Sequence, residues 1–431
     1  MSLNHVSAIG LATLLLLTGC VLPGDETDDS DLTTAKESED NVLGCTYASA
    51  DNYISNATVD DGSCSFEDAL EGEYDEGYDD GYSDGYDEGY GDGYADGGYG
   101  STLDAIISRG YMVCGVKNSQ YGMGYLEASG TYTGLDIEYC KAIAAAIGLD
   151  PETDVEYFPA SGSNRFELLA YGEIDVLIRT TTWTTSRDAD LNADFAGINF
   201  YDGQGILVNL DAYTAEDGTG APTSALELDG AKICVGIGTT TEGNIADYFT
   251  VNNMEYTAVN SDDAATAKAQ FEDGSCDAWT GDMSAMVAQK FGLDTEAVPN
   301  SAIMPELLSK EPLAAATRDN DDDWNDVVTW VWFGMLTAEE LGITSANYGS
   351  ADMTIPANER LLNNNLGLGT EANPLAATWM QSVLAAVGNY EEAYTESFCT
   401  FDDSGDCLID RAGSQNAPYW EGGLQYSPPM R

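Results

Sequence analysis

The sequence predicts an α/β fold with two sets of mostly parallel strands, preceded by a disordered acidic spacer. From residue 101 onward, short apolar segments alternate with segments of helical period, a pattern typical of chains that build parallel sheets. The alternation stops after Ile178 and starts again at Lys232, which predicts two blocks. Residues 21–100 are acidic and offer little aliphatic surface for a core.

Each predicted element combines an apolar period with a stop signal, and glycines at 110, 148 and 172 end the first three helices. The first block comprises helices at Leu103–Arg109, Asp136–Ile147 and Phe166–Tyr171 and strands at Tyr111–Val116, Val155–Phe158 and Ile174–Ile178. The second comprises strands at Lys232–Ile237 and Asp277–Thr280 and helices at Thr241–Phe249, Ser261–Phe271 and Ser284–Phe291. Two more helices are predicted at Trp324–Met335, where the tryptophans should pack in the core, and at Pro374–Val387.

Charge and length exclude several classes of function. The 431 residues are enough for two or three domains. Aspartate and glutamate number 75 against 15 lysines and arginines, and the net charge of −60 argues against a nucleic-acid partner. The single histidine, His5, lies in a segment that we expect to be removed, which leaves no imidazole for a catalytic triad or a zinc site. We expect no metal and no cofactor.

The N-terminus predicts export. The apolar run Ala8–Thr18 is too short to span a bilayer and suits the core of a signal peptide at residues 1–19. Leu17-Thr18-Gly19-Cys20 resembles a bacterial lipobox, in which the cysteine thiol becomes the attachment point of lipid, palmitate included. The expected location is therefore the periplasm or the cell surface, with Cys20 anchored in the membrane. The alternative is an ordinary signal peptide with a cysteine there by chance.

Residues 20–100 are interpreted as an acidic spacer that contains a small module and a repeat. Cys45 and Cys64 bracket the module, which we interpret as a disulfide loop, with a calcium loop from its aspartates as the alternative. A Gly-Tyr pair then recurs every four residues up to Tyr94, with acidic residues between. Glycine at that spacing disfavours helix, so a solvated tether is favoured over a sticky tyrosine segment or a marginal helix.

The cysteine count is consistent with an oxidising compartment. Nine cysteines less Cys20 leave eight, which allow 105 pairings, and the sequence alone does not choose among them. Local order favours four pairs: Cys45–Cys64, Cys114–Cys140, Cys234–Cys276 and Cys399–Cys407. If all eight are paired, no thiolate remains for nucleophilic or metal chemistry.

A series of short motifs carries a family resemblance through their shared order. They are Cys114-Gly115-Val116, Thr133–Ile137, Arg165–Leu169, Gly172–Leu177, Thr180–Asp188, Tyr201–Gly205, Leu228–Ala231, Gly238–Glu242, Glu340–Asn347, Gly388–Tyr390 and Gly422–Arg431. Over about 101–431 the chain resembles the substrate-binding proteins of general L-amino-acid ABC importers, in the polar amino-acid uptake family. The family also carries cysteines near 114, 140, 234 and 276, which favours those pairings.

The resemblance implies a two-lobe, type II periplasmic-binding-protein-like fold. We expect lobe 1 to comprise 101–207 plus 312–431 and lobe 2 to comprise 208–311, with a hinge near Val208 and Pro312. An L-amino acid would bridge the lobes, stabilise the closed form and be delivered to the permease subunits of an ABC transporter. No bond is made or broken, so the protein is not expected to be an enzyme.

The chemistry of a free amino acid indicates which residues bind it. Arg187 can hold the carboxylate through its guanidinium fork. Thr239 and Thr240 belong to a Thr-x-x-Glu pattern that opens a helix, whose N-terminus favours anions. The family resemblance places Thr240 at the ligand carboxylate, and Asp282 would pair with the ammonium group.

Thr180 and Thr182 should add hydroxyl or backbone contacts, and Arg165 is a candidate contact for the ligand side chain. Three of the few arginines, at 165, 179 and 187, lie close together in so acidic a chain, which favours an anion pocket, although Arg179 could instead form a salt bridge. The loop Lys117–Tyr125 should line the side-chain end of the pocket. The alternatives are plain: threonine-rich turns are usually loops, a Thr-x-x-Glu box is usually a cap, and a lone arginine is usually on the surface.

Two other functions stay open at this point. Some proteins on the same scaffold are transglycosylase- or dehydratase-like enzymes, which need a glutamate acid in the cleft and, for the former, a lysozyme-like domain that this sequence lacks. A surface sensor or adhesin that uses the Gly-Tyr spacer is the third interpretation.

Overall fold

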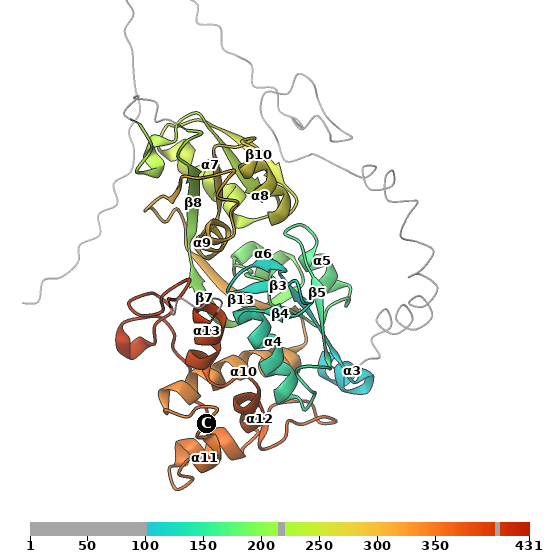
Figure 1. Cartoon of the computed structure of the whole chain (residues 1–431). Helices are drawn as coiled ribbons and strands as arrows, with labels where there is room; N and C mark the ends of the chain where they lie inside the picture. Colours follow the sequence, from blue (N-terminus) through green and yellow to red (C-terminus); the bar gives the residue numbers. More distant parts are fainter. Residues whose placement is uncertain (1–100, 214–219, 401–405) are drawn as a thin grey trace, which may run out of the picture. The chain divides into compact units, whose positions relative to one another are not determined.

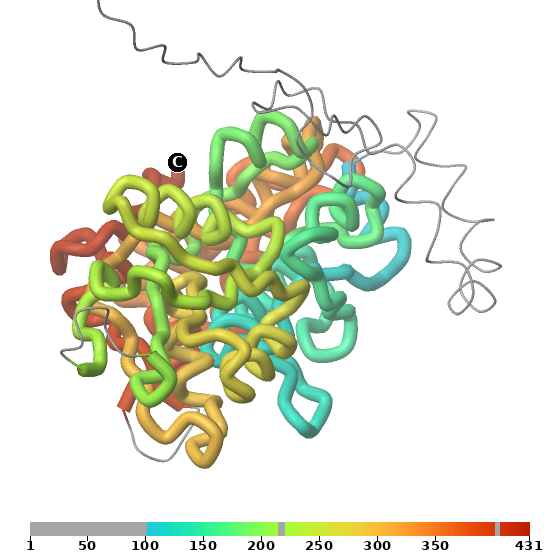
Figure 2. The backbone as a smooth tube through the Cα atoms, turned by 90° about the horizontal axis from the view of Figure 1, so that it is seen from above, coloured from blue at the N-terminus to red at the C-terminus, as the bar shows by residue number. Residues whose placement is uncertain are grey.

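The computed structural model describes residues 101–213, 220–400 and 406–431, which belong to one compact unit, Gly93–Arg431. The predictions for the signal peptide, Cys20, the Cys45–Cys64 module and the Gly-Tyr repeat lie outside the described residues. Figures 1 and 2 follow the chain from cyan and teal into a green and yellow segment and back to orange and red. This path corresponds to two sheets, each with its own helices.

The first sheet has five strands in the order β5-β1-β6-β13-β7. They are β1 (Met112–Val116), β5 (Val155–Pro159), β6 (Val176–Leu177), β7 (Ala193–Asp202) and β13 (Glu311–Arg318). β1 pairs in parallel with β5 and β6, whereas β13 pairs antiparallel with both β6 and β7. The parallel strands are those that the strand–helix alternation predicts.

This part contains a series of helices, most of which pack into one large hydrophobic core, while Leu169 belongs to a second, smaller core. The helices are α3 (Thr102–Arg109), α4 (Leu135–Ala146), α5 (Arg165–Ala170), α6 (Thr185–Asp190), α10 (Asp322–Glu340), α11 (Pro356–Asn363), α12 (Trp379–Ala386) and α13 (Tyr390–Cys399), with short 3-10 turns at Tyr348–Ser350 and Tyr419–Glu421. Trp324 and Trp332 of α10 are completely buried, and Trp330 packs at the edge of the same core, which confirms their structural role.

Local sequence sets the ends of these helices. The Ser101 side chain accepts the amide of Leu103 and so caps α3, and Gly110 ends it in the left-handed conformation at φ 85°. Gly134 precedes α4 at φ 115°, where a Cβ would lie only 2.3 Å from the carbonyl oxygen of Met123. Only glycine fits at this position, because both the φ angle and the contact exclude a side chain.

The second sheet repeats the plan, in the order β10-β9-β11-β8-β12. Its strands are β8 (Gln204–Asn209), β9 (Ala231–Gly236), β10 (Tyr256–Ser261), β11 (Ala278–Asp282) and β12 (Ser301–Ile303), and its helices are α7 (Thr240–Val251), α8 (Ala264–Glu272) and α9 (Met283–Phe291), with a 3-10 turn at Ala225–Glu227. β9 pairs in parallel with β10 and β11, and β8 pairs antiparallel with β11 and β12. Two smaller cores lie on this sheet.

Each sheet is therefore mixed, not mostly parallel. The antiparallel strands β7, β8, β12 and β13 escaped the sequence analysis because they do not alternate with helices, and the parallel strand β10, which lies between α7 and α8, was missed as well. β7 and β8 follow each other with only Gly203 between them, and they belong to different sheets. A small hairpin sheet of β2 (Ser119–Gln120), β3 (Gly124–Leu126) and β4 (Tyr132–Thr133) was also not predicted.

The chain passes between the two sheets at Asp202–Gln204 and again just before Glu311, where β13 begins. We expected the first crossing near Val208. It lies earlier in the chain, because Gln204 already pairs with Asp282 of the second sheet. We call residues 101–202 plus 311–431 the first lobe and residues 203–310 the second lobe.

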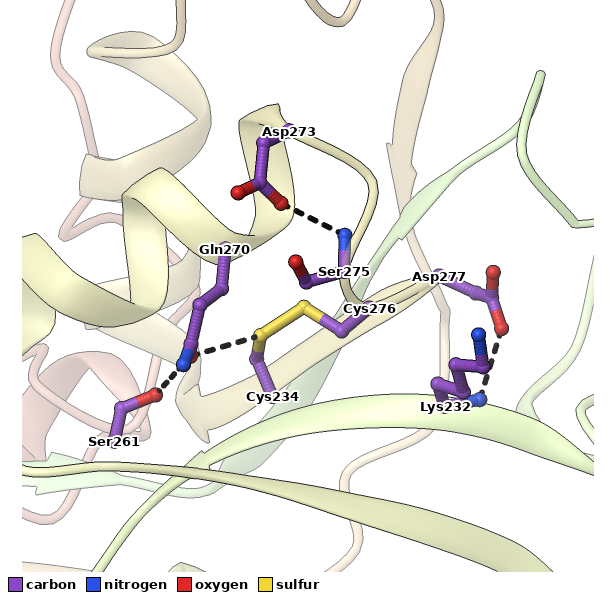
Figure 3. Close-up of a disulfide and its surroundings, with 8 residues drawn as sticks. All are labelled: Lys232, Cys234, Ser261, Gln270, Asp273, Ser275, Cys276 and Asp277. Atoms are coloured by element: carbon purple, nitrogen blue, oxygen red, sulfur yellow. Dashed lines mark hydrogen bonds between the residues drawn. A yellow bond between two sulfur atoms is a disulfide. The ribbon is translucent and has the colours of Figure 1, made fainter.

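Three of the expected disulfides are present among the described residues: Cys114–Cys140, Cys234–Cys276 and Cys399–Cys407. The bond from Cys234 of β9 to Cys276 crosses next to α8 (Figure 3). Gln270 of α8 lies 3.7 Å from the Cys234 sulfur and accepts a hydrogen bond from the Ser261 hydroxyl at 2.6 Å. This cluster fixes α8 to the edge of the sheet.

Within the part of the chain that the structure describes, no helix is both long and apolar enough to cross a bilayer.

Candidate functional site

A cleft with about 760 Å³ of empty space, part of it open to solvent, lies where the lobes meet. All seven residues that the sequence analysis named as ligand contacts line it: Arg165, Thr180, Thr182 and Arg187 from the first lobe, and Thr239, Thr240 and Asp282 from the second. Lys117, Arg179, Trp279, Met286 and Gln289 are among the other lining residues. Of the loop Lys117–Tyr125, which we expected at the side-chain end of the pocket, only Lys117 reaches the cleft.

The backbone of the threonine-rich turn after β6 is held by a hydrogen bond to a buried carboxylate. Thr180 has φ 43°, an uncommon value for a β-branched residue. Its backbone amide donates to Oδ2 of Asp136 at 2.9 Å, and Asp136 also accepts from Nδ2 of Asn199 at 3.2 Å. The Thr180 hydroxyl is buried and has no partner among the described residues. A buried hydroxyl without a partner is costly unless a ligand completes it.

Arg187 lies on α6, which Thr184 caps by accepting the amide of Arg187 itself. Its Nη1 donates to the carbonyl oxygen of Thr182 at 2.9 Å, and its guanidinium carbon lies 5.7 Å from the centre of the Phe166 ring. Only 8% of the residue is exposed. Burial lowers the pKa of the guanidinium, while Glu311 and Asp282 act in the opposite direction. The side chain is thus fixed in the cleft with donors left over for an anion.

Arg165 reaches across the cleft to the second lobe. One of its terminal nitrogens donates to the carbonyl oxygen of Gly162, and the other donates to that of Gly238 at 3.3 Å. Its Nε is buried without a partner among the described residues. The pKa of this side chain is lowered to about 8. Burial is the main cause, and the positive charges of the nearby Arg179 and Arg187 add to it.

Four cations therefore converge on the cleft: Lys117, Arg165, Arg179 and Arg187. The ion pairs found in the described residues involve other cations, and none of these four has a carboxylate within pairing distance. Arg179 does not form the salt bridge considered above, since its Nε donates to the carbonyl oxygen of Ala160 at 2.7 Å. Arg165 and Arg187 are buried and Lys117 and Arg179 are half-buried, and such a group of cations without carboxylate partners among the described residues is an anion-binding arrangement.

The second lobe presents the N-terminus of α7. Thr239 is the N-cap, and its hydroxyl accepts the amide of Glu242 at 3.3 Å, as the Thr-x-x-Glu pattern predicts. The reciprocal half of a capping box is shifted by one residue, because Glu242 accepts the amide of Gly238 at 3.0 Å and not that of Thr239. The helix end is positive and faces the cleft.

Asp282 is the N-cap residue of α9, yet its side chain makes no capping hydrogen bond. The backbone amide of Ser284 is instead met by both carboxylate oxygens of Asp202, each at 3.3 Å, from the end of β7. The Asp282 carboxylate is therefore not used to cap its own helix, and it lines the cleft. Burial raises its pKa to about 6, and Lys117 is the strongest of the groups that hold the value down.

Glu311 is a central residue that the sequence analysis missed. It is 1% exposed and accepts hydrogen bonds from the hydroxyls of Thr182 and Thr240, at 2.6 and 2.8 Å. Asp136, Asp202 and Lys117 were also missed as individual residues. Glu311 belongs to none of the short motifs, and the motifs Thr133–Ile137 and Tyr201–Gly205 gave no sign of the roles of Asp136 and Asp202, because these side chains act on residues that are remote in sequence.

Comparison with known proteins agrees with this geometry. The sequence model of the bacterial extracellular solute-binding proteins, family 3, matches residues 112–348. The glutamate/glutamine/aspartate/asparagine-binding protein BztA of Rhodobacter capsulatus is 41% identical over 336 residues, which are 77% of this chain and 94% of that protein. The general L-amino acid-binding periplasmic protein AapJ of Rhizobium johnstonii is 38% identical over 334 residues, with 77% and 93% covered.

A solved structure leads to the same family. The ABC transporter periplasmic binding protein from Brucella ovis with glutathione bound has a TM-score of 0.69 and 39% identity, and the match covers 77% of this chain and 100% of that one. The fold, the two-sided cleft and the relatives confirm the resemblance found in the sequence: the chain belongs to the bacterial extracellular solute-binding proteins, family 3.

Proposed function

We propose that this solute-binding protein captures L-amino acids between its lobes and delivers them to the permease of an ABC transporter. The observation that carries the proposal is that a single cleft is lined by four cations, none of them paired with a carboxylate among the described residues, and by one carboxylate, Asp282, that makes no capping hydrogen bond. A zwitterion needs both signs of charge, and the cleft offers both. The names of the relatives in Rhodobacter capsulatus and Rhizobium johnstonii support the same ligand class.

Each end of the zwitterion has its own binding group. Arg187 binds the carboxylate with the guanidinium nitrogens that Thr182 does not occupy. The N-terminus of α7, from Thr239 and Thr240, adds its positive end from the other lobe. Asp282 binds the ammonium group, and the Thr180 hydroxyl, which lacks a partner among the described residues, completes the contacts.

The remaining cations select the ligand side chain. With Arg187 engaged, Lys117, Arg165 and Arg179 still face the cleft. These groups favour side chains that end in carboxylate or amide oxygens, and they disfavour lysine and arginine. Glutathione, the ligand in the Brucella ovis structure, carries the same amino-carboxylate group on its glutamyl end, so it belongs among the compounds to test.

Binding and release involve no reaction, and the enzyme alternatives have no support in the cleft. A transglycosylase- or dehydratase-like mechanism needs a glutamate acid directed at the ligand. Glu311, which has four donors around its carboxylate, lies outside the set of residues that line the cleft. The membrane anchor is proposed from the lipobox alone: Cys20→Ser should release the protein from the cell membrane and abolish labelling with radioactive palmitate.

A thermal-shift screen against the common L-amino acids and glutathione tests the proposal. A ligand that binds only the folded protein raises its melting temperature. We expect the largest shifts with glutamate, aspartate and their amides. Arg187→Ala should weaken binding of the best ligand by about 2–5 kcal/mol in calorimetry. Arg187→Lys, which keeps the charge and loses the fork, should recover only part of it. A screen with no shift, or an unchanged affinity in Arg187→Ala, contradicts the proposal.

A further inference from the structure

The carboxylate of Glu311 lies at the crossing between the lobes and receives four hydrogen bonds. Its Oε2 accepts from the hydroxyls of Thr182, in the first lobe, and Thr240, in the second. Its Oε1 accepts from Nδ2 of Asn244 at 2.8 Å and from the hydroxyl of Ser309 at 2.5 Å. Two carboxylate oxygens offer about four acceptor sites in all. Glu311 is therefore completely satisfied by groups from both sides of the cleft.

The direction of these hydrogen bonds has a consequence for the two threonines. A hydroxyl has one proton to donate and keeps only its lone pairs for other partners. Because Glu311 is a carboxylate, it can only accept, so the Thr182 and Thr240 hydroxyls must both donate to it. Their oxygens lie 3.4 Å apart, and neither proton is left for the carboxylate of an amino acid.

We propose that Glu311 is a positioning residue with two effects. It fastens the lobes together through Thr240 and Asn244, and it accepts the hydroxyl hydrogen bonds of Thr182 and Thr240, so that neither hydroxyl can donate to the ligand. The second part of this inference rests on the proposed function, whereas the first part does not. The ligand carboxylate then receives its hydrogen bonds from Arg187 and from backbone amides. The two threonine hydroxyls contribute to affinity only through the closure of the lobes.

The contact across the crossing is measurable without any ligand. Nitroxide labels on the exposed residues Tyr171, in the first lobe, and Val251, in the second, report the distance between lobes in the full chain. Without amino acid, we expect Glu311→Gln to widen the distribution toward longer distances, because the amide cannot accept all four donors. Glu156→Gln, at an exposed position of β5, removes the same charge and should leave the distribution unchanged. Identical distributions in Glu311→Gln and the unsubstituted protein would overturn the first part.

A double-mutant cycle with L-glutamate as the probe tests the second part. Thr240→Val and Glu311→Gln should each weaken binding about tenfold, as expected for a hydrogen bond to a charged group. If Thr240 acts through Glu311, the double variant also loses only about tenfold, because both changes break the same contact. A loss of about a hundredfold means that Thr240 donates to the ligand directly, and the second part is then wrong.

The two measurements separate this inference from the proposed function. If the unsubstituted protein binds neither L-glutamate nor any other amino acid, the proposed function fails and the claim about Thr182 and Thr240 fails with it. The distance measurement still decides whether Glu311 fastens the lobes.

Discussion

Oδ2 of Asp136 accepts a hydrogen bond from the backbone amide of Thr180 at 2.9 Å, and this contact ties helix α4 to the threonine-rich turn. Asp136 is completely buried, and burial raises its pKa to about 6, against the opposing effect of the Thr180 amide. Thr180 is held at φ 43° by this bond while its hydroxyl stays without a partner among the described residues. The first lobe thus keeps an unfavourable conformation at the place where we propose that ligand binds.

Thr180→Gly should make the protein more stable and weaken its binding of ligand. Glycine adopts positive φ without strain, and the substitution also removes the unsatisfied hydroxyl, so the free energy of unfolding should rise by about 1 kcal/mol. Affinity for the best amino acid should fall about tenfold, because a ligand contact is lost. Urea unfolding and calorimetry measure the two effects. Thr180→Ala, which loses the hydroxyl and keeps the strain, should lose affinity without the same gain in stability.

Ligand affinity should fall as the pH is lowered through about 6, the pKa to which burial raises the Asp282 carboxyl. Only the ionised carboxylate pairs with an ammonium group, so protons compete with the ligand. Affinity should level off between that value and about 8, where the pKa values of Lys117 and Arg165 lie, and should fall about tenfold for each pH unit well below 6. Calorimetry over this pH range in one ionic strength gives the profile.

Loss of the folded state does not explain such a decline. A carboxyl whose pKa is higher in the folded protein than in the unfolded chain binds protons better when folded, so its protonation favours folding as the pH drops from about 6 toward the ordinary aspartate pKa of 3.8. Asp136 and Asp202 also titrate, with pKa values of about 6 and about 7 raised first by burial. The variant Asp282→Asn distinguishes the titration of Asp282 from those of the other two carboxyls. If this variant binds ligand more weakly but shows the same pH dependence as the unsubstituted protein, Asp282 is not the group responsible.

Lys117→Met should change both the ligand preference and the pH profile. Lys117 is the strongest of the groups that lower the pKa of Asp282, so its removal should move the decline in affinity to higher pH. Its own pKa is lowered to about 8, chiefly by burial, and it donates to Oε1 of Gln120 at 2.7 Å. We expect a larger loss of affinity for L-glutamate than for L-alanine. Lys290→Met, at an exposed site on α9, is the matched control. Equal losses for both ligands would exclude Lys117 as a selector.

Removal of the Cys234–Cys276 disulfide should destabilise the second lobe. The two cysteines are separated by 42 residues, and replacing both by serine should lower the free energy of unfolding by about 4 kcal/mol in the chain-entropy model. The Cys399–Cys407 pair closes a separation of only 8, and its removal should cost about 2–3 kcal/mol. Urea unfolding without reductant compares the two double variants. Equal effects would indicate that loop length does not govern their contributions.

The sequence predicted those features that local residues decide. Apolar residues recur with a clear period in the strands β1, β9 and β11 and in the helices that follow β1 and β9. A capping residue or a glycine also marks one end of each of these helices. The turn from Thr180 to Arg187 carries several candidate contacts within one short segment, so their proximity in space follows from their proximity in sequence. Each of the three disulfides found among the described residues joins two cysteines with no other cysteine between them in the sequence.

Only the tertiary structure decided the antiparallel halves of the sheets and the residues that support the cleft. β13 pairs with β7 across more than a hundred residues of chain, and no local period indicates such pairing. Glu311 is 129 residues from Thr182, and Asp136 is 44 from Thr180. A single carboxylate carries no sign of which remote donors will meet it, because hydrogen bonds depend on positions within about 3 Å that the complete fold alone provides.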